Sequence, residues 1–178
     1  LEPDLRFEKL IRKRGVRSTS GIASITVITK DYACPGQCIY CPKEPDMPKS
    51  YLSNEPAVMR AILNDFDPYR QVVSRLKGLQ KTGHRTDKIE MIISGGTFNF
   101  YPKAYQRNFV KGVYNGLNYD YGDGKKERSL DEAQRKNEKA NNRCVGLSIE
   151  TRPDYIDEES LKFFRKLGVT KVELGVQC

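Results

Sequence analysis

The chain has 178 residues, of which 38% are apolar, and it carries 31 lysines and arginines against 23 aspartates and glutamates. This length suits one sizeable domain and is too short for two, and the net charge of +8 favours an anionic partner such as nucleic acid or a phosphorylated ligand. No apolar run reaches the roughly 18 residues of a membrane span and no secretory leader pattern is present, so we expect a cytoplasmic protein without a membrane partner.

Residues 1–20 show no clear hydrophobic period and are predicted to be a basic N-terminal arm ahead of a core that spans residues 21–178. Five positive charges and no negative one fall within a short stretch of this arm, at Lys9, Arg12, Lys13, Arg14 and Arg17. Such clusters bind phosphates with little regard for sequence. The arm is therefore a candidate nucleic-acid contact, and a merely solvated basic surface is the alternative.

The first predicted strand spans residues 23–30, where β-branched residues dominate, and it leads into a loop rich in Cys, Pro and Gly. A helix is predicted to begin at Pro56. A second helix follows it because Asp67 can cap its amino end, Pro68 suits its first position and Gly83 can stop it.

Residues 88–94 form the second predicted strand, which runs directly into a glycine turn. A helix is expected over residues 102–117, where apolar residues recur every three or four positions. The polar, glycine-rich stretch 118–128 reads as an exposed insertion. Ser129 and Glu132 then form the capping box of a charged helix that is predicted to end near residue 141.

A third strand is predicted over residues 143–151, a helix between the cap Asp157 and the stop Gly168, and a fourth strand over residues 170–177. Alternating strands and helices build parallel βαβ units, so the fold class is α/β. A complete barrel of such units takes about 250 residues. The sequence therefore predicts a partial parallel (β/α) barrel with about four βα units.

Three of the five cysteines, Cys34, Cys38 and Cys41, lie within eight positions in the loop after the first strand. A structural zinc site needs four ligands, whereas a 4Fe-4S cluster held by three thiolates keeps one iron free to bind a substrate or cofactor. From the residues alone two alternatives stay open. One is a zinc site completed by Cys144 or an outside ligand, and the other is a set of redox-active or inert thiols.

Because ligands gather at the carboxyl ends of parallel strands, the residues that follow the later strands are candidates for the same site. Gly95 and Gly96 can let the backbone approach a ligand closely, although an ordinary glycine turn explains them too. Glu150 and Arg152 flank the end of the third strand, and a surface ion pair would explain them without any function. Gln177, at the end of the fourth strand, is a further polar candidate.

The spacing Cys34-x3-Cys38-x2-Cys41, with Tyr40 before the last cysteine, resembles the signature of the radical S-adenosylmethionine (SAM) superfamily. The resemblance implies a 4Fe-4S cluster on the three cysteines, with SAM bound to the free iron and Tyr40 near its adenine. It further implies SAM contacts for the candidate residues at the strand ends. These candidate residues are Gly95, Gly96, Glu150, Arg152 and Gln177. Among them, the Glu150 carboxylate could accept from the ribose diol of SAM and the Arg152 guanidinium could fork its carboxylate.

Longer stretches, among them "SNEPAVMRAILNDFDPY", "ISGGTF", "ETRPDY" and "ELGVQ", resemble the catalytic subunit of Elongator, the Elongator protein three family, in its archaeal or bacterial form. The likeness runs from about residue 15 to the end. It implies a tRNA carboxymethyluridine synthase, a radical SAM transferase that uses acetyl-CoA to modify C5 of wobble uridine 34. It also implies acetyl-CoA binding by Lys88 and tRNA binding by the basic arm, and it leaves a homo-oligomer or an Elongator-like assembly open.

Two features depart from the family pattern. The loop reads "CPKEP" where the family usually has two glycines after the proline, and the first cysteine spacing is shorter than in most relatives. Family members also finish the barrel and add an acetyltransferase-like domain, so the chain is expected to be an incomplete core that is inactive by itself. The alternatives are a radical SAM enzyme with another substrate and a zinc-stabilised tRNA-binding module.

Overall fold

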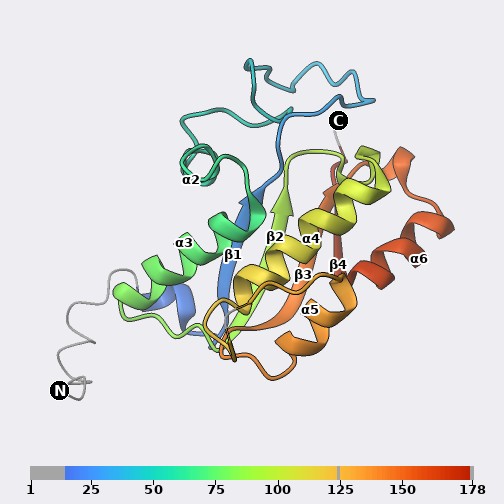
Figure 1. The fold of residues 1–178 in the computed structure, drawn as a ribbon. Coiled ribbons are helices and arrows are strands. Elements are labelled where there is room, and N and C mark those ends of the chain that lie inside the picture. The colour runs from blue at the N-terminus through green and yellow to red at the C-terminus, as the bar shows by residue number, and fades with distance from the viewer. Residues whose placement is uncertain (1–14, 124, 177–178) are drawn as a thin grey trace.

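In the computed structural model, which describes residues 15–123 and 125–176, four strands form one parallel sheet (Figure 1). They are β1 (Ala23–Ile28), β2 (Lys88–Ser94), β3 (Arg143–Thr151) and β4 (Lys171–Leu174). Strand order in the sheet equals strand order in the chain. The predicted α/β class with four strands of a parallel sheet is confirmed.

Five α-helices and three short 3-10 turns connect the strands within the described residues. The helices are α2 (Pro56–Ile62), α3 (Pro68–Lys81), α4 (Lys103–Leu117), α5 (Leu130–Asn137) and α6 (Glu158–Leu167). The 3-10 turns are η1 (Gly15–Ser18), η2 (Phe98–Phe100) and η3 (Pro153–Tyr155). None of the helices in the described part combines the length and hydrophobicity that crossing a bilayer requires.

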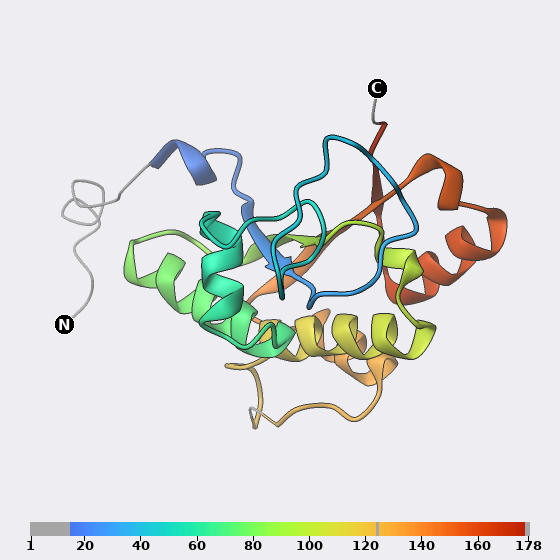
Figure 2. The same ribbon diagram turned by 90° about the horizontal axis from the view of Figure 1, so that it is seen from above.

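The apolar core lies between one face of the sheet and helices α3 to α6. Alternate strand residues point to it, and Ile25, Ile89 and Ile149 are completely buried there. Figure 2, which looks down from above, shows α3, α4 and α5 on one side of the sheet. The opposite face is mixed. Ile28 packs there against Val58 and Ala61 of α2, whereas Ser148 and Glu173 are hydrogen-bonded to each other at 2.9 Å. The alternation of side chains between the two faces follows from the two-residue period of a strand.

Local capping signals set most helix boundaries where they were predicted. Asp67 accepts a hydrogen bond of 2.7 Å from the backbone N–H of Arg70, with Pro68 as the first residue of α3. Ser129 and Glu132 form the expected capping box of α5. Gly168 adopts the left-handed conformation, with φ of 86°, and ends α6. These boundaries depend on neighbours in the chain, which is why the sequence predicts them.

Three boundaries were predicted too far along the chain. Helix α5 ends at Asn137 and not near residue 141, because the Asn137 side chain bonds the backbone of the next strand. Its amide donates to Asn142 O at 3.1 Å and accepts from Cys144 N–H at 2.8 Å. Asparagine side chains compete with helical bonds in this way. Strand β1 ends at Ile28 and β4 at Leu174, because their last partners, Ser94 and Thr151, are the final residues of β2 and β3.

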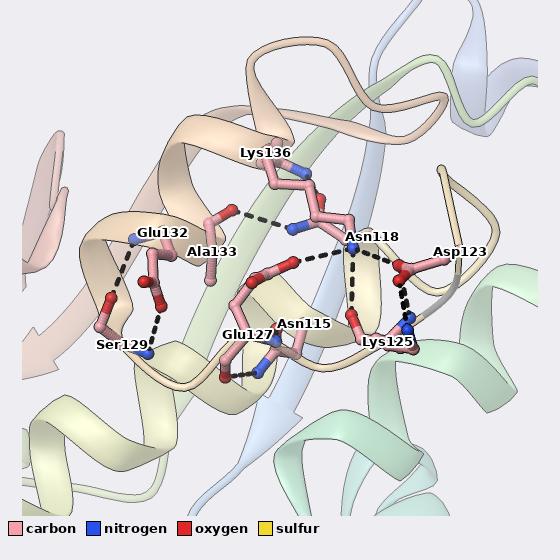
Figure 3. A network of polar contacts seen from close by, with 10 residues as sticks. Asn115, Asn118, Asp123, Lys125, Glu127, Ser129, Glu132, Ala133 and Lys136 are labelled. Atoms are coloured by element: carbon pink, nitrogen blue, oxygen red, sulfur yellow. Dashed lines mark hydrogen bonds and ion pairs between the residues drawn. The ribbon is translucent and has the colours of Figure 1, made fainter.

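The stretch 118–128 is largely exposed, as predicted, but it is tied to the fold (Figure 3). The Asn115 side chain accepts from Glu127 N–H at 2.8 Å and donates to Glu127 O at 3.1 Å. Lys136, whose side chain is only 14% exposed, contacts the Glu127 carboxylate at 2.9 Å and Lys125 O at 3.0 Å. The insertion is therefore anchored near its carboxyl end from both α4 and α5.

The predicted N-terminal arm lies mostly outside the described residues, and this applies to Lys9, Arg12, Lys13 and Arg14. Arg17 falls within η1, where only its backbone is described. The nearby Ser18 hydroxyl lies 2.9 Å from His84 Nδ1, which joins this end of the arm to the turn before β2.

Candidate cofactor site

A pocket of about 490 Å³ lies beyond the carboxyl ends of the strands. Its walls come from the loop between β1 and α2, the turn after β2 and the ends of β3 and β4 (Figure 1). It is lined by seven residues that the sequence proposed for one site, namely Cys34, Cys38, Tyr40, Cys41, Gly96, Glu150 and Arg152. The parallel topology brings these residues together from three separate segments, as expected for strand ends at one edge.

Two predicted site residues do not line this pocket, and a third lies outside the described residues. Lys88 is the exposed first residue of β2, at the opposite end of that strand from the pocket. Gly95 is adjacent to the pocket wall but is not part of it. Gln177 is the residue that falls outside the described range.

The three clustered cysteines are half-buried free thiols on the pocket wall. Cys34 Sγ lies 3.6 Å from Thr97 Oγ1 and accepts from Gly36 N–H at 3.4 Å. Cys41 Sγ lies 2.7 Å from the Ser50 hydroxyl. The Cys34 and Cys41 thiols are therefore held by polar neighbours from the loop and from the turn after β2.

The donor chemistry of this wall suits a cluster better than a single ion. Among the described residues, no three His, Cys, Asp or Glu side chains are gathered closely enough to hold one metal ion. A zinc site needs four ligands around one centre, with Zn–S distances of about 2.3 Å. A 4Fe-4S cluster binds each thiolate to a different iron and needs only three thiols around a shared space. Three thiols along one pocket wall fit that second requirement.

Arg152 reaches from the end of β3 into the cysteine loop. Its Nη1 donates to Cys38 Sγ at 2.9 Å, while Nε and Nη2 fork the Asp154 carboxylate at 2.9 and 2.6 Å. The bonds to Asp154 and then to Cys38 raise the pKa of the guanidinium above its ordinary value. Gly36 makes room for it, because a Cβ there would lie 2.3 Å from Nη1. The bidentate contact that was predicted between Arg152 and the carboxylate of a ligand is thus made with Asp154 instead.

Glu150 is held by donors from two other segments. Tyr51 Oη lies 2.7 and 2.6 Å from its two carboxylate oxygens, the Ser94 hydroxyl donates at 2.7 Å and Gly95 N–H at 3.4 Å. Burial, followed by the charge of Glu150, raises the pKa of Tyr51, so the phenol remains a donor. Glu150 therefore ties the loop before α2 to the ends of β2 and β3.

Tyr51 is a pocket residue that sequence reasoning missed. It lies in the polar loop after the cysteines, far along the chain from the carboxylate that it contacts. A contact between residues 99 positions apart leaves no local pattern in the sequence. A tyrosine in the proline-rich loop was the available indication that Tyr51 could belong to the site.

Different structural constraints act on Gly95 and Gly96, the two glycines after β2. Gly95 has φ of +140°, and a Cβ there would lie 1.8 Å from Thr29 Oγ1, so packing between the ends of β1 and β2 requires it. Gly96 has φ of +90° and lines the pocket. A cofactor contact is therefore a better hypothesis for Gly96 than for Gly95.

Cys144 lies in the first half of β3 and not at the pocket. Its thiol donates to Gly146 O at 3.3 Å, and burial raises its pKa to about 11. The alternative of a zinc site completed by Cys144 therefore has no support from the described residues.

We expect iodoacetamide at pH 8 to alkylate the clustered cysteines of the metal-free protein much faster than Cys144. The thiolate is the reacting species, and a thiol with a pKa near 11 is almost fully protonated at that pH. Peptide mass spectrometry of the native protein checks this, with the denatured protein as the control in which Cys144 reacts freely. Equal rates for Cys144 and Cys38 in the native protein would contradict the burial described above.

Comparisons with known proteins are consistent with one family. No protein-family model matches the chain. It is 47% identical over 174 residues to a protein named tRNA uridine(34) acetyltransferase from Methanocaldococcus infernus, covering 94% of this chain and 32% of that protein. It is 38% identical over 178 residues to Elongator complex protein 3 from Saccharomyces cerevisiae, covering 94% and 31%. The chain thus spans about a third of the length of these relatives.

A solved structure shares the fold. The archaeal Methanocaldococcus infernus Elp3 with an N-terminal deletion matches with a TM-score of 0.67 and 39% sequence identity. The match covers 88% of this chain and 29% of that chain. The four-stranded parallel sheet and its helices therefore resemble a part of that larger structure.

Proposed function

Because the chain belongs to the Elongator protein three family, we propose that it is the cofactor-binding part of an enzyme that modifies uridine 34 of tRNA. The observation that carries the proposal is the pocket in which Cys34, Cys38 and Cys41 share a wall with Glu150 and Arg152. Relatives named for transfer of an acetyl group to uridine 34 supply the substrate class. Acetyl-CoA is the corresponding donor, and a carboxymethyl group on C5 is our finer proposal for the product.

The three cysteines would hold a 4Fe-4S cluster, with SAM in the remaining pocket space. When bound, the cluster and SAM supply radical chemistry that can remove hydrogen from carbon, while the protein supplies placement and shielding. Tyr40, which lines the pocket and is 72% exposed, would cover the adenine of SAM. Gly96 has no side chain, so its backbone could approach the bound SAM closely.

Arg152 and Glu150 act in this proposal as positioning residues more than as direct ligands. Arg152 holds Cys38 Sγ through one N–H while Asp154 fixes its remaining fork. Glu150 fixes the loop through Tyr51. Both arrangements keep the cysteine loop against the strand ends, where a cofactor site must be preorganised.

The acetyl-CoA role of Lys88 and the tRNA role of the basic arm remain proposals from the family resemblance. Lys88 lies at the other end of β2 from the cysteines, so it would act at a separate surface. The arm, with Lys9, Arg12, Lys13, Arg14 and Arg17, would contact phosphates of tRNA. A homo-oligomer or an Elongator-like assembly is compatible with either role.

The test incubates the anaerobically reconstituted full-length protein with tRNA, SAM, a reductant and acetyl-CoA. We expect mass spectrometry of the digested tRNA to find a carboxymethyl group on uridine 34, and none when acetyl-CoA or SAM is omitted. A rate of SAM cleavage that does not change when tRNA or acetyl-CoA is added would favour a radical SAM enzyme with another substrate. One zinc, no iron and no modified uridine would favour the zinc-stabilised tRNA-binding module.

A further inference from the structure

A second pocket, of about 320 Å³, lies on the helical side of the sheet. Its walls are the connection between α2 and α3, one face of α4, Lys30 after β1 and Lys126 from the anchored stretch 118–128. It shares no lining residue with the cofactor pocket. Neither the cysteines nor the family resemblance assigns it a role.

The pocket combines aromatic rings with lysines. Lys126 Nζ lies 3.7 Å from the centre of the Tyr69 ring, and Lys30 Nζ lies 5.3 Å from the centre of the Tyr105 ring. Lys111 is the third lysine of the wall, and its ammonium donates to the Arg128 carbonyl at 3.2 Å. Ammonium groups beside aromatic faces suit a ligand that is both anionic and planar.

The carboxylates at the pocket do not neutralise these lysines. Asp67 is used as the cap of α3, and Asp65 pairs with Arg70. Among the described residues, Lys30, Lys111 and Lys126 form no ion pair with any carboxylate. Three lysines against the single carboxylate of Asp67, which has no cationic partner among the described ion pairs, leave the pocket wall with a net positive charge, and this favours a phosphate group.

The backbone on either side of Lys126 is held by hydrogen bonds. Lys126 sits between Lys125, whose carbonyl accepts from Lys136, and Glu127, which is held by Asn115 and Lys136 (Figure 3). Because this stretch is already anchored, a ligand that binds beside it would lose less free energy to ordering the loop.

The opposite wall contains local strain. Asp65 and Phe66 both have φ of 53°, the left-handed region that non-glycine residues rarely adopt. Each such residue costs on the order of 1–3 kcal/mol, and strain of this kind concentrates at ligand sites. It turns the chain sharply between α2 and α3 and places Phe66 and Tyr69 on the pocket wall.

We propose that this second pocket binds a nucleotide unit, with its phosphate among Lys30, Lys111 and Lys126 and its base along the wall of Tyr69 and Tyr105. An RNA strand and a free nucleotide both offer this chemistry. The proposal does not depend on a cluster or on SAM. It rests on the proposed function only in taking tRNA as the RNA probe.

The test measures tRNA binding by the full-length protein through fluorescence anisotropy over a series of salt concentrations. The double variant Lys111→Ala with Lys126→Ala is expected to bind about tenfold more weakly and to lower the magnitude of the log–log salt slope by about 1 to 2. Lys77→Ala is the matched control, because Lys77 also lies over a tyrosine ring, that of Tyr119, outside the pocket. It is expected to change affinity less than about twofold.

A second arm titrates the protein with AMP and measures binding by ligand-observed NMR. If the double variant loses AMP binding but keeps its tRNA affinity, the pocket is supported as a nucleotide site and is assigned to free nucleotides. Two results together would overturn the proposal. One is an equal loss of tRNA affinity in the double variant and in Lys77→Ala. The other is that AMP does not bind, or binds the double variant and Lys77→Ala equally well. Loss of uridine modification with intact binding would instead concern the cofactor site.

Discussion

Replacing Cys38 by serine in the full-length protein is expected to abolish cluster assembly and SAM cleavage together. Its sulfur is the middle one of the three along the loop and the one that Arg152 contacts. Serine is a much poorer ligand for iron than thiolate, and a cluster with one free iron has no spare protein ligand to lose. Iron and sulfide analysis, the visible absorption of the reconstituted protein and release of 5′-deoxyadenosine measure the effect.

Cys144→Ser is the matched control for this experiment. Cys144 lies in β3 away from the pocket, and a serine hydroxyl can still donate to Gly146 O. It is expected to retain about four iron atoms and SAM cleavage. A Cys38→Ser protein that keeps its cluster and its cleavage activity would remove the basis of the proposed function.

Gly95→Ala is expected to destabilise the ends of β1 and β2 by roughly 2–5 kcal/mol, since backbone strain and overpacking each contribute about 1–3 kcal/mol. The added methyl group would overlap Thr29 Oγ1, and alanine disfavours φ of +140°. Amide hydrogen exchange of peptides from β1 and β2 in the full-length protein measures this local free energy.

A double-mutant cycle separates packing from backbone strain. Thr29→Ala removes the hydroxyl that an alanine at position 95 would meet, at the cost of its hydrogen bond to Tyr101. The pair Thr29→Ala with Gly95→Ala is therefore expected to be less destabilised than the sum of the single variants. Strict additivity would show that the steric contact is not the cause, and an undiminished free energy in Gly95→Ala would refute the packing argument.

The sequence predicted those parts of the fold that depend on near neighbours. Asp67, Ser129 and Gly168 act within one helical turn of the boundaries that they set, so their patterns can be read along the chain. The premature end of α5 was not predictable in this way. It depends on Asn137 meeting a strand that begins only after the next turn.

The candidate site was predictable as a gathering of residues but not as a set of contacts. Parallel strands must bring Cys38, Gly96 and Glu150 to one edge, whatever their partners. The bonds of Glu150 to Tyr51 and of Arg152 to Cys38 join positions 99 and 114 apart. Such pairings depend on the exact path of a loop, which periodicity and spacing do not encode.

The order of the strands also has a consequence for how the chain folds. β1 pairs with β2, β2 with β3 and β3 with β4, so each strand finds its partner in the strand made just before it. A ribosome that releases the chain from its amino end delivers the strands in the order in which they pair, and domains fold as synthesis proceeds. Each of the strands β2 to β4 therefore meets its partner already made and can pair as soon as it is itself synthesised.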